Sequence, residues 1–333
     1  MIGLRRFRPR FNLPAGPRIL ILAGSIAVLP VPHAQATYSI VARDPETGEV
    51  GAAVQSHWFQ VHPVIWVEPG IGAVATQSLA DFTYGPAGLE LLRLGRGADA
   101  ALRGLIATDD AADVRQVAIL DFDGDIAVHT GASCIAEAGH SVGEDYSVQA
   151  NLMARDTVPA AMAHAFETAT GDLADRMIAA LEAAQAEGGD IRGQQSAALL
   201  VAAPSGTGKP WADFPIDLRV DDHPAPVAEL RRLLDLSRAY ESMNEGDLAI
   251  ERKDFAAAEL AYGDAARRAP GNPEVLFWYG ISLANAGRVD DAVARLREVY
   301  AIDDAWKDLP ARLVAAGLLP DDAALVRRLE SSK

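Results

Sequence analysis

The chain has 333 residues, half of them hydrophobic, and its 46 acidic residues outnumber its 30 lysines and arginines, which gives a formal net charge of −16 at pH 7. A surface this acidic repels the phosphates of nucleic acids and anionic lipid head groups, so we expect neither as a partner. The single cysteine, Cys134, cannot form a disulfide within the chain, and the length is enough for one large domain or two.

Residues 1–36 predict a cleaved secretory signal. Four arginines between positions 5 and 10 precede an apolar run over residues 19–29, and residues 34–36, Ala-Gln-Ala, fit a small-x-small cleavage pattern. The run is shorter than the ~20 residues that a membrane-spanning helix needs, although an uncleaved anchor is the alternative. Cleavage leaves Thr37 as the first residue and removes only basic charges. Because the signal directs export, we expect a periplasmic or secreted protein with no membrane span.

Segments typical of strands and helices follow in order along residues 37–220. Turn sequences such as Asp-Pro-Glu-Thr-Gly at residues 44–48 separate the strand segments, which predicts hairpins. Hairpins with pairs of helices between them indicate an α+β fold. The predicted strands are 37–43, 50–56, 64–67, 73–76, 116–122, 125–130, 147–153 and 195–202, and the predicted helices are 86–94, 98–107, 158–168 and 173–187.

Beyond residue 220 the pattern becomes entirely helical. Residues 221–226 are typical of a linker, and we expect residues 221–238 to hold this linker and a first helix. A 34-residue period over residues 239–333 repeats Gly246 as Gly280 and Ala258 as Ala292, where small residues let paired helices approach closely. This region resembles two tetratricopeptide repeats, which implies contact with a protein partner or self-association; a plain helical bundle is the alternative.

Thr37 is the first candidate catalytic residue. A threonine hydroxyl is a poor nucleophile and needs a base, and a free α-amine on the same residue can serve as one. That amine titrates near ~7.7–8.0, so much of it is unprotonated at neutral pH. The alternative is that Thr37 merely begins an edge strand.

Several ordered motifs resemble the bacterial domain of unknown function 1028 family. They cover about residues 37–220 and are TYSIVARDPETG at 37–48, GAVATQ at 72–77, YGPAGL at 84–89, HTG at 129–131, AGH at 138–140, SVQAN at 147–151 and DIRGQQS at 190–196. The resemblance implies an N-terminal-nucleophile (Ntn) hydrolase-like fold, an αββα sandwich of two antiparallel sheets between helical layers. Cytoplasmic members begin Met-Thr, so methionine removal exposes the same threonine. The resemblance implies a nucleophile position but no substrate.

Other polar residues are candidates for the same site. Ser56 and Gln77 end strands and are candidates for contacting the amine or the substrate, and Asn151 is a candidate donor to an oxyanion. Asp190, Arg192 and Gln195 form a polar cluster that enters a buried strand and either braces the loop or holds a substrate carboxylate. Family members often carry glycine where this chain has Ala150, so its methyl is expected to narrow a pocket beside Asn151.

We expect no cofactor and no metal site. His129, Cys134 and His140 lack a recognisable metal-ligand spacing, although these ligand types suit zinc. Residues 205–209 resemble a phosphate-binding loop and residues 121–125 a calcium loop, but each lacks the residues that hold the ion, so both are interpreted as turns.

Two functional hypotheses result. The first is an exported amide-bond hydrolase with Thr37 as the nucleophile and its α-amine as the base, acting on a small-molecule or peptide amide. The second is a non-catalytic binding protein whose helical repeats make the contact. The sequence alone leaves the choice between them open.

Overall fold

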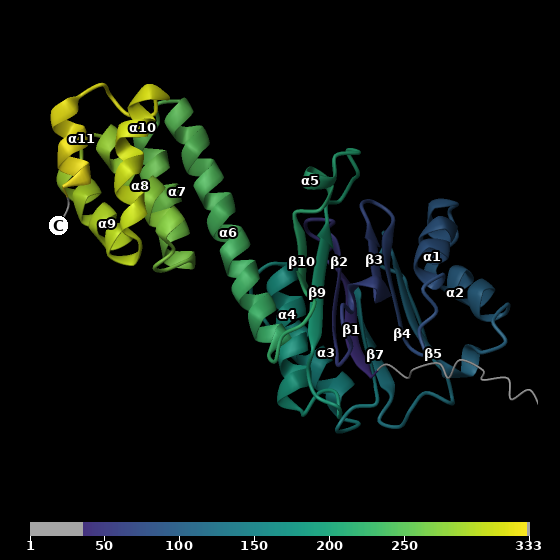
Figure 1. The fold of residues 1–333 in the computed structure, drawn as a ribbon. Coiled ribbons are helices and arrows are strands. Elements are labelled where there is room, and N and C mark those ends of the chain that lie inside the picture. The colour runs from purple at the N-terminus through teal and green to yellow at the C-terminus, as the bar shows by residue number, and fades with distance from the viewer. Residues whose placement is uncertain (1–35, 332–333) are drawn as a thin grey trace, which may run out of the picture. The chain divides into compact units, whose positions relative to one another are not determined.

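The structure is a computed structural model that describes residues 36–331 (Figure 1). Apart from Ala36, the predicted signal peptide lies outside the described residues. Strands and helices alternate up to Val220, and only helices follow, so the predicted α+β class with an all-helical C-terminal region is confirmed. Between residues 36 and 331, none of the helices has the length and apolarity that crossing a membrane requires.

The strands form two antiparallel sheets. One sheet has six strands in the order β10-β9-β2-β1-β8-β7, and the other has four in the order β3-β4-β5-β6. The strands are β1 (Thr37–Arg43), β2 (Val50–Ser56), β3 (Ile65–Glu68), β4 (Gly72–Ser78), β5 (Arg115–Asp121), β6 (Ile126–Thr130), β7 (Gly139–Gly143), β8 (Tyr146–Asn151), β9 (Ser196–Ala202) and β10 (Ile216–Val220).

The two sheets pack face to face and each is covered on its other face by helices (Figure 1). Because side chains alternate along a strand, Tyr38 and Ile40 of β1 enter the core beneath the helices, whereas Val41 enters the layer between the sheets. The four-stranded sheet is covered by α1 (Tyr84–Arg93) and α2 (Ala98–Ile106), and the six-stranded sheet by α3 (Val158–Thr168) and α4 (Leu173–Ala186).

Most predicted elements occur within two residues of their expected bounds, but two strands and one α-helical turn were not predicted, in addition to the 3-10 turns His62–Val64 and Ala112–Val114. The strands are β7 and β10, and the helical turn is α5 (Pro210–Asp213). Both β7 and β10 are edge strands, with a neighbour on one side only. An edge strand buries little, so its sequence lacks the continuous apolar pattern that reveals β9.

The C-terminal helices pack as two helix pairs, as the repeat predicts. The pairs are α6 (Pro226–Glu251) with α7 (Phe255–Arg268) and α8 (Pro273–Asn285) with α9 (Val289–Ile302). A Cβ added at Gly246 would lie 2.8 Å from the Tyr262 ring, and one at Gly280 would lie 3.1 Å from Leu296. These glycines therefore permit the close helix contact. After α9 come a short 3-10 turn (Asp304–Asp308), α10 (Leu309–Ala315) and α11 (Ala323–Glu330).

Helix α6 is continuous through the position at which the repeat region was expected to begin. Residues 238 and 239 both lie inside it, because nothing between Pro226 and Glu251 breaks a helix. Its first turns bury Val227, Leu230 and Leu234 in the core beneath the six-stranded sheet, and its later turns form a second core with α7. One helix thus contributes to both hydrophobic cores.

Two arginines of α6 bind one carboxylate of α4. Asp175 accepts a hydrogen bond from Arg231 Nη1 at 2.7 Å and from Arg238 Nη1 at 3.0 Å. Burial raises the pKa of the Asp175 carboxyl, but the hydrogen bonds and charges of Arg238 and Arg231 outweigh burial and hold that pKa below its usual range. The folded state therefore favours the ionised carboxylate.

We expect Asp175→Asn to lower the free energy of unfolding at pH 7 by about 1–3 kcal/mol, because two charged donors lose the carboxylate that they share, although each keeps a second acidic partner. Since the folded pKa is depressed, the contribution is present above the unfolded value of ~3.9 and is lost as the pH falls through the folded value. Urea unfolding at pH 7 and pH 3.5 measures this. The exposed Asp123→Asn is a control of equal charge, and equal stability of Asp175→Asn and wild type at pH 7 would contradict the expectation.

Candidate functional site

Thr37 begins the central strand β1 and lies between two polar residues of its neighbours. It pairs with Ser56 of β2 on one side and with Asn151 of β8 on the other. All three residues are buried, and the Thr37 hydroxyl donates to Ser56 Oγ at 3.1 Å. Residues directly opposite each other share one face of a sheet, so these three side chains meet in the layer between the sheets.

Two glutamines of the facing sheet complete this polar layer. The side-chain amide of Gln77 donates to the carbonyl oxygen of Thr37 at 3.2 Å and to Gln116 Oε1 at 2.7 Å. The amide of Asn151 donates to the same two acceptors, at 3.4 and 3.0 Å. The main chain of Thr37 is therefore held by amides from both sheets.

The buried network continues along both sheets, beyond the residues that contact Thr37. Ser39 donates to Gln77 Oε1 at 2.6 Å and accepts from Gln149 Nε2 at 2.7 Å. Gln116 in turn donates to the carbonyl of Ala150 at 3.0 Å and to Thr130 Oγ1 at 3.0 Å. A buried polar group costs free energy unless it is paired, and here each amide has several partners, so the network fixes the geometry around Thr37.

The carbonyl of Ala36, immediately before Thr37, is held by two donors. Ser56 Oγ donates to it at 2.5 Å and Arg192 Nη2 at 2.9 Å. Ala36 itself is fully buried. In the chain that still carries Ala36, this residue and its carbonyl therefore occupy the space next to the Thr37 hydroxyl.

Asp190 fixes Arg192 in that position. Its fully buried carboxylate accepts from Arg192 Nη2 at 3.0 Å and Nε at 3.2 Å. It also accepts from the backbone N–H groups of Arg192 at 2.8 Å and His57 at 2.9 Å. A buried carboxylate with this many donors is fully compensated, and the pair orients the guanidinium toward the carbonyl of Ala36.

The remaining candidates lie elsewhere. The Gln195 amide donates to Asp222 at 3.2 Å, away from the Thr37 cluster, although its backbone N–H binds the Ser56 carbonyl at 3.2 Å. Ala150 contributes its side chain to the core beneath the helices, so the expectation that its methyl narrows a pocket beside Asn151 is wrong. Neighbouring strand residues point to opposite faces, which is the physical reason.

The histidines and the cysteine that were considered as metal ligands each bind a protein group. His129 Nε2 lies 2.8 Å from the Ala112 carbonyl, His140 Nδ1 lies 2.9 Å from Thr130 Oγ1, and Cys134 donates to the Arg115 carbonyl at 3.4 Å. Burial, followed by the nearby His129, lowers the pKa of His140. Among residues 36–331 no group of three potential metal ligands lies together.

Gln116, Ser39 and Gln149 belong to the cluster but were not singled out from the sequence. Each lies on a strand where an isolated polar residue is normally taken to face solvent. The signal that existed was spacing: Gln149 and Asn151 share one face of β8, and Ser39 and Thr37 share one face of β1. Recognising that these faces are buried required the second sheet.

We expect Gln77→Ala to lower the free energy of unfolding by at least about 3 kcal/mol, because four buried polar groups each lose one partner and a cavity opens in their place. Denaturant unfolding followed by circular dichroism measures the loss. Gln195→Ala removes the same amide from a half-buried position and should change stability by less than about 1 kcal/mol. Equal effects of the two substitutions would mean that the network does not stabilise the inter-sheet layer.

The fold and the site together define a class: an α+β protein with two facing antiparallel sheets, a polar cluster around Thr37 and a helical-repeat region. The model of a family of unknown function, DUF1028, matches residues 37–230, and a tetratricopeptide-repeat model matches residues 249–316. The chain belongs to the DUF1028 family.

A solved structure of the same family is similar in fold. The crystal structure of protein SPO2555 from Silicibacter pomeroyi superposes with a TM-score of 0.55 at 29% sequence identity. The match covers 64% of this chain and 92% of that chain. A search of curated proteins found no match.

Proposed function

We propose that the protein is an exported amidohydrolase of the Ntn type, in which cleavage after Ala36 makes Thr37 both nucleophile and base. The Thr37 hydroxyl attacks an amide carbonyl and its proton passes to the free α-amine, which delivers it to the leaving amine. Water then hydrolyses the acyl ester on Thr37 and regenerates the hydroxyl. The two facing sheets between helical layers suit the Ntn-hydrolase arrangement that the sequence motifs imply.

The observation that carries this proposal is the pair of donors on the Ala36 carbonyl. Ser56 Oγ and Arg192 Nη2 both donate to a carbonyl oxygen directly beside the proposed nucleophile. Once Ala36 is removed, the same donors face an attacked carbonyl, whose oxygen gains negative charge and needs donors held in place. Gln77 and Asn151 act as positioning residues, because they hold the carbonyl of Thr37 itself.

Burial explains why processing would control the activity. Ala36 and Thr37 are both fully buried in the described chain, so no substrate reaches the hydroxyl while Ala36 remains. Removing residue 36 and those before it frees the amine and opens the space that Ala36 fills. The proposal therefore links export to activation in one cleavage.

The test is the intact mass of the exported protein, followed by reaction with a β-lactone. We expect a chain that begins at Thr37 and gains one lactone, whereas the uncleaved chain gains none. A different first residue, or a blocked amine, would contradict the proposal. Equal labelling of the uncleaved chain would also contradict it, because the site is closed there.

A further inference from the structure

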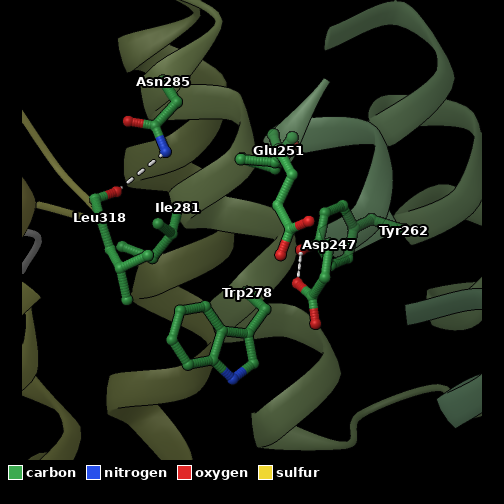
Figure 2. Close-up of a pocket in the computed structure, with 9 residues that line it drawn as sticks. Asp247, Glu251, Tyr262, Trp278, Ile281, Asn285 and Leu318 are labelled. Atoms are coloured by element: carbon green, nitrogen blue, oxygen red, sulfur yellow. Dashed lines mark hydrogen bonds between the residues drawn. The ribbon is translucent and has the colours of Figure 1, made fainter. Parts of the chain in front are cut away.

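The helical repeats contain a cavity that the proposed hydrolase does not use. It has a volume of about 290 Å³ and lies between α6, α7 and α8 (Figure 2). Its walls are largely apolar, formed by Ile250, Ile281 and the indole of Trp278, and Leu318 contributes a side chain that is 47% exposed. The cavity therefore combines an apolar interior with an apolar, accessible rim.

The polar groups that line the cavity are mostly acceptors. Asp247 and Glu251 are four residues apart on α6, so their carboxylates lie on one face of the helix. Neither forms an ion pair with any residue in the described part of the chain. Among residues 36–331, the Asp247 carboxylate accepts a hydrogen bond only from the Tyr262 hydroxyl. Burial, then that hydrogen bond, raises the pKa of the Tyr262 phenol, which keeps it a donor.

The nearby N–H donors already have partners. Trp278 Nε1 donates to Glu274 at 2.7 Å, and the Asn285 amide donates to the Leu318 carbonyl at 3.1 Å (Figure 2). The Asn285 oxygen and the two carboxylates therefore remain as acceptors. Two carboxylates without a countercharge, in a cavity that an indole also lines, favour a cation.

Ser282 adds a hydroxyl to the wall of the cavity. Its residue is only 4% exposed and lines the cavity. Its hydroxyl has no hydrogen bond to any other residue between 36 and 331. The hydroxyl is therefore available, as a donor or an acceptor, to a polar group that enters the cavity.

We propose that this cavity binds a lysine or arginine side chain of a partner protein. The cation lies against Trp278 and the two carboxylates, its methylene stem contacts Ile250 and Ile281, and apolar neighbours in the partner segment cover Leu318. A protein segment fits better than a free amine because the apolar rim extends the contact beyond one charged group. The proposal does not depend on Thr37 being active.

The probe is the pentapeptide acetyl-Gly-Leu-Lys-Leu-Gly-amide, titrated at constant ionic strength into full-length ¹⁵N-labelled protein. The indole N–H resonance of Trp278, assigned with Trp278→Phe, reports binding. We expect this peptide and its arginine counterpart to shift the resonance, and the norleucine and glutamate counterparts to leave it unchanged. Asp247→Asn combined with Glu251→Gln should weaken binding at least tenfold, since each amide keeps the shape and loses the charge.

Glu245→Gln combined with Asp321→Asn is the matched control, because it removes two exposed carboxylates outside the cavity. An equal loss of binding in this control would overturn the proposal, as would equal binding of the norleucine peptide or the absence of any shift. Butylammonium binding as tightly as the peptide would identify a small-cation site instead. If the protein self-associates, and Asp247→Asn combined with Glu251→Gln abolishes that association, the occupant is a second copy of this chain. That result would overturn the proposal of a separate partner protein.

Discussion

We expect Thr37→Ala to abolish the reaction of the processed protein with a β-lactone and all of its amide hydrolysis, while the protein still folds. Removing a nucleophile lowers the rate by a factor on the order of 10⁶, because the remaining site only binds and polarises the substrate. Thr37→Ser keeps a hydroxyl beside the amine and should retain measurable labelling. Intact mass after lactone treatment measures both variants.

Thr76→Ala is the matched control for this experiment. Thr76 is also a fully buried strand threonine, and its hydroxyl has no hydrogen-bond partner among the described residues. It lies on β4 and faces the helices instead of the inter-sheet layer. A lactone adduct retained in Thr37→Ala would show that another group is the nucleophile.

The second large effect is expected from Ser56→Ala, which should lower the rate of acylation by a factor of about 10²–10³. Ser56 both accepts from the Thr37 hydroxyl and donates to the carbonyl that precedes it. Its loss removes one of the two donors available to a developing oxyanion. The rate constant of lactone labelling, followed by mass spectrometry over time, measures the change.

Ser196→Ala tests whether that effect is specific. Ser196 pairs directly with Ser56 across β2 and β9 and is equally buried, but its hydroxyl donates to the Trp58 carbonyl at 2.5 Å and accepts from the Val61 N–H at 3.0 Å. We expect this variant to lose stability and keep its labelling rate. If both variants slow labelling equally, Ser56 acts only through packing.

Much of the fold was predictable because local patterns were strong. The strands at residues 37–43 and 50–56 have the predicted bounds, since alternating β-formers flank the Asp-Pro-Glu-Thr-Gly turn. The paired glycines at 246 and 280 likewise predicted the two helix pairs. The edge strands β7 and β10 were missed because they bury too little to impose a pattern.

The site was predictable only in part. Thr37, Ser56, Gln77 and Asn151 come together, because each lies at or next to the end of a strand, and these strand ends meet at the same end of the facing sheets. Gln77 and Gln116 are paired within one sheet, but their contacts with Thr37 and Asn151 depend on how the two sheets face each other, which no local pattern encodes. Successive side chains at the start of a strand lie on opposite faces. The Gln195 side chain therefore binds Asp222 away from the Thr37 cluster, whereas the neighbouring Ser196 is buried.

The continuity of α6 has a practical consequence for anyone who wishes to separate the two halves of this molecule. Ending the chain at residue 220 removes Val227, Leu230 and Leu234 from beneath the six-stranded sheet. The apolar surface that these side chains cover then becomes exposed to water. A shortened chain that ends after Leu236 keeps those anchors and discards the repeats, although it also loses the hydrogen bond from Arg238 to Asp175. Any comparison of the isolated halves is meaningful only with that later cut.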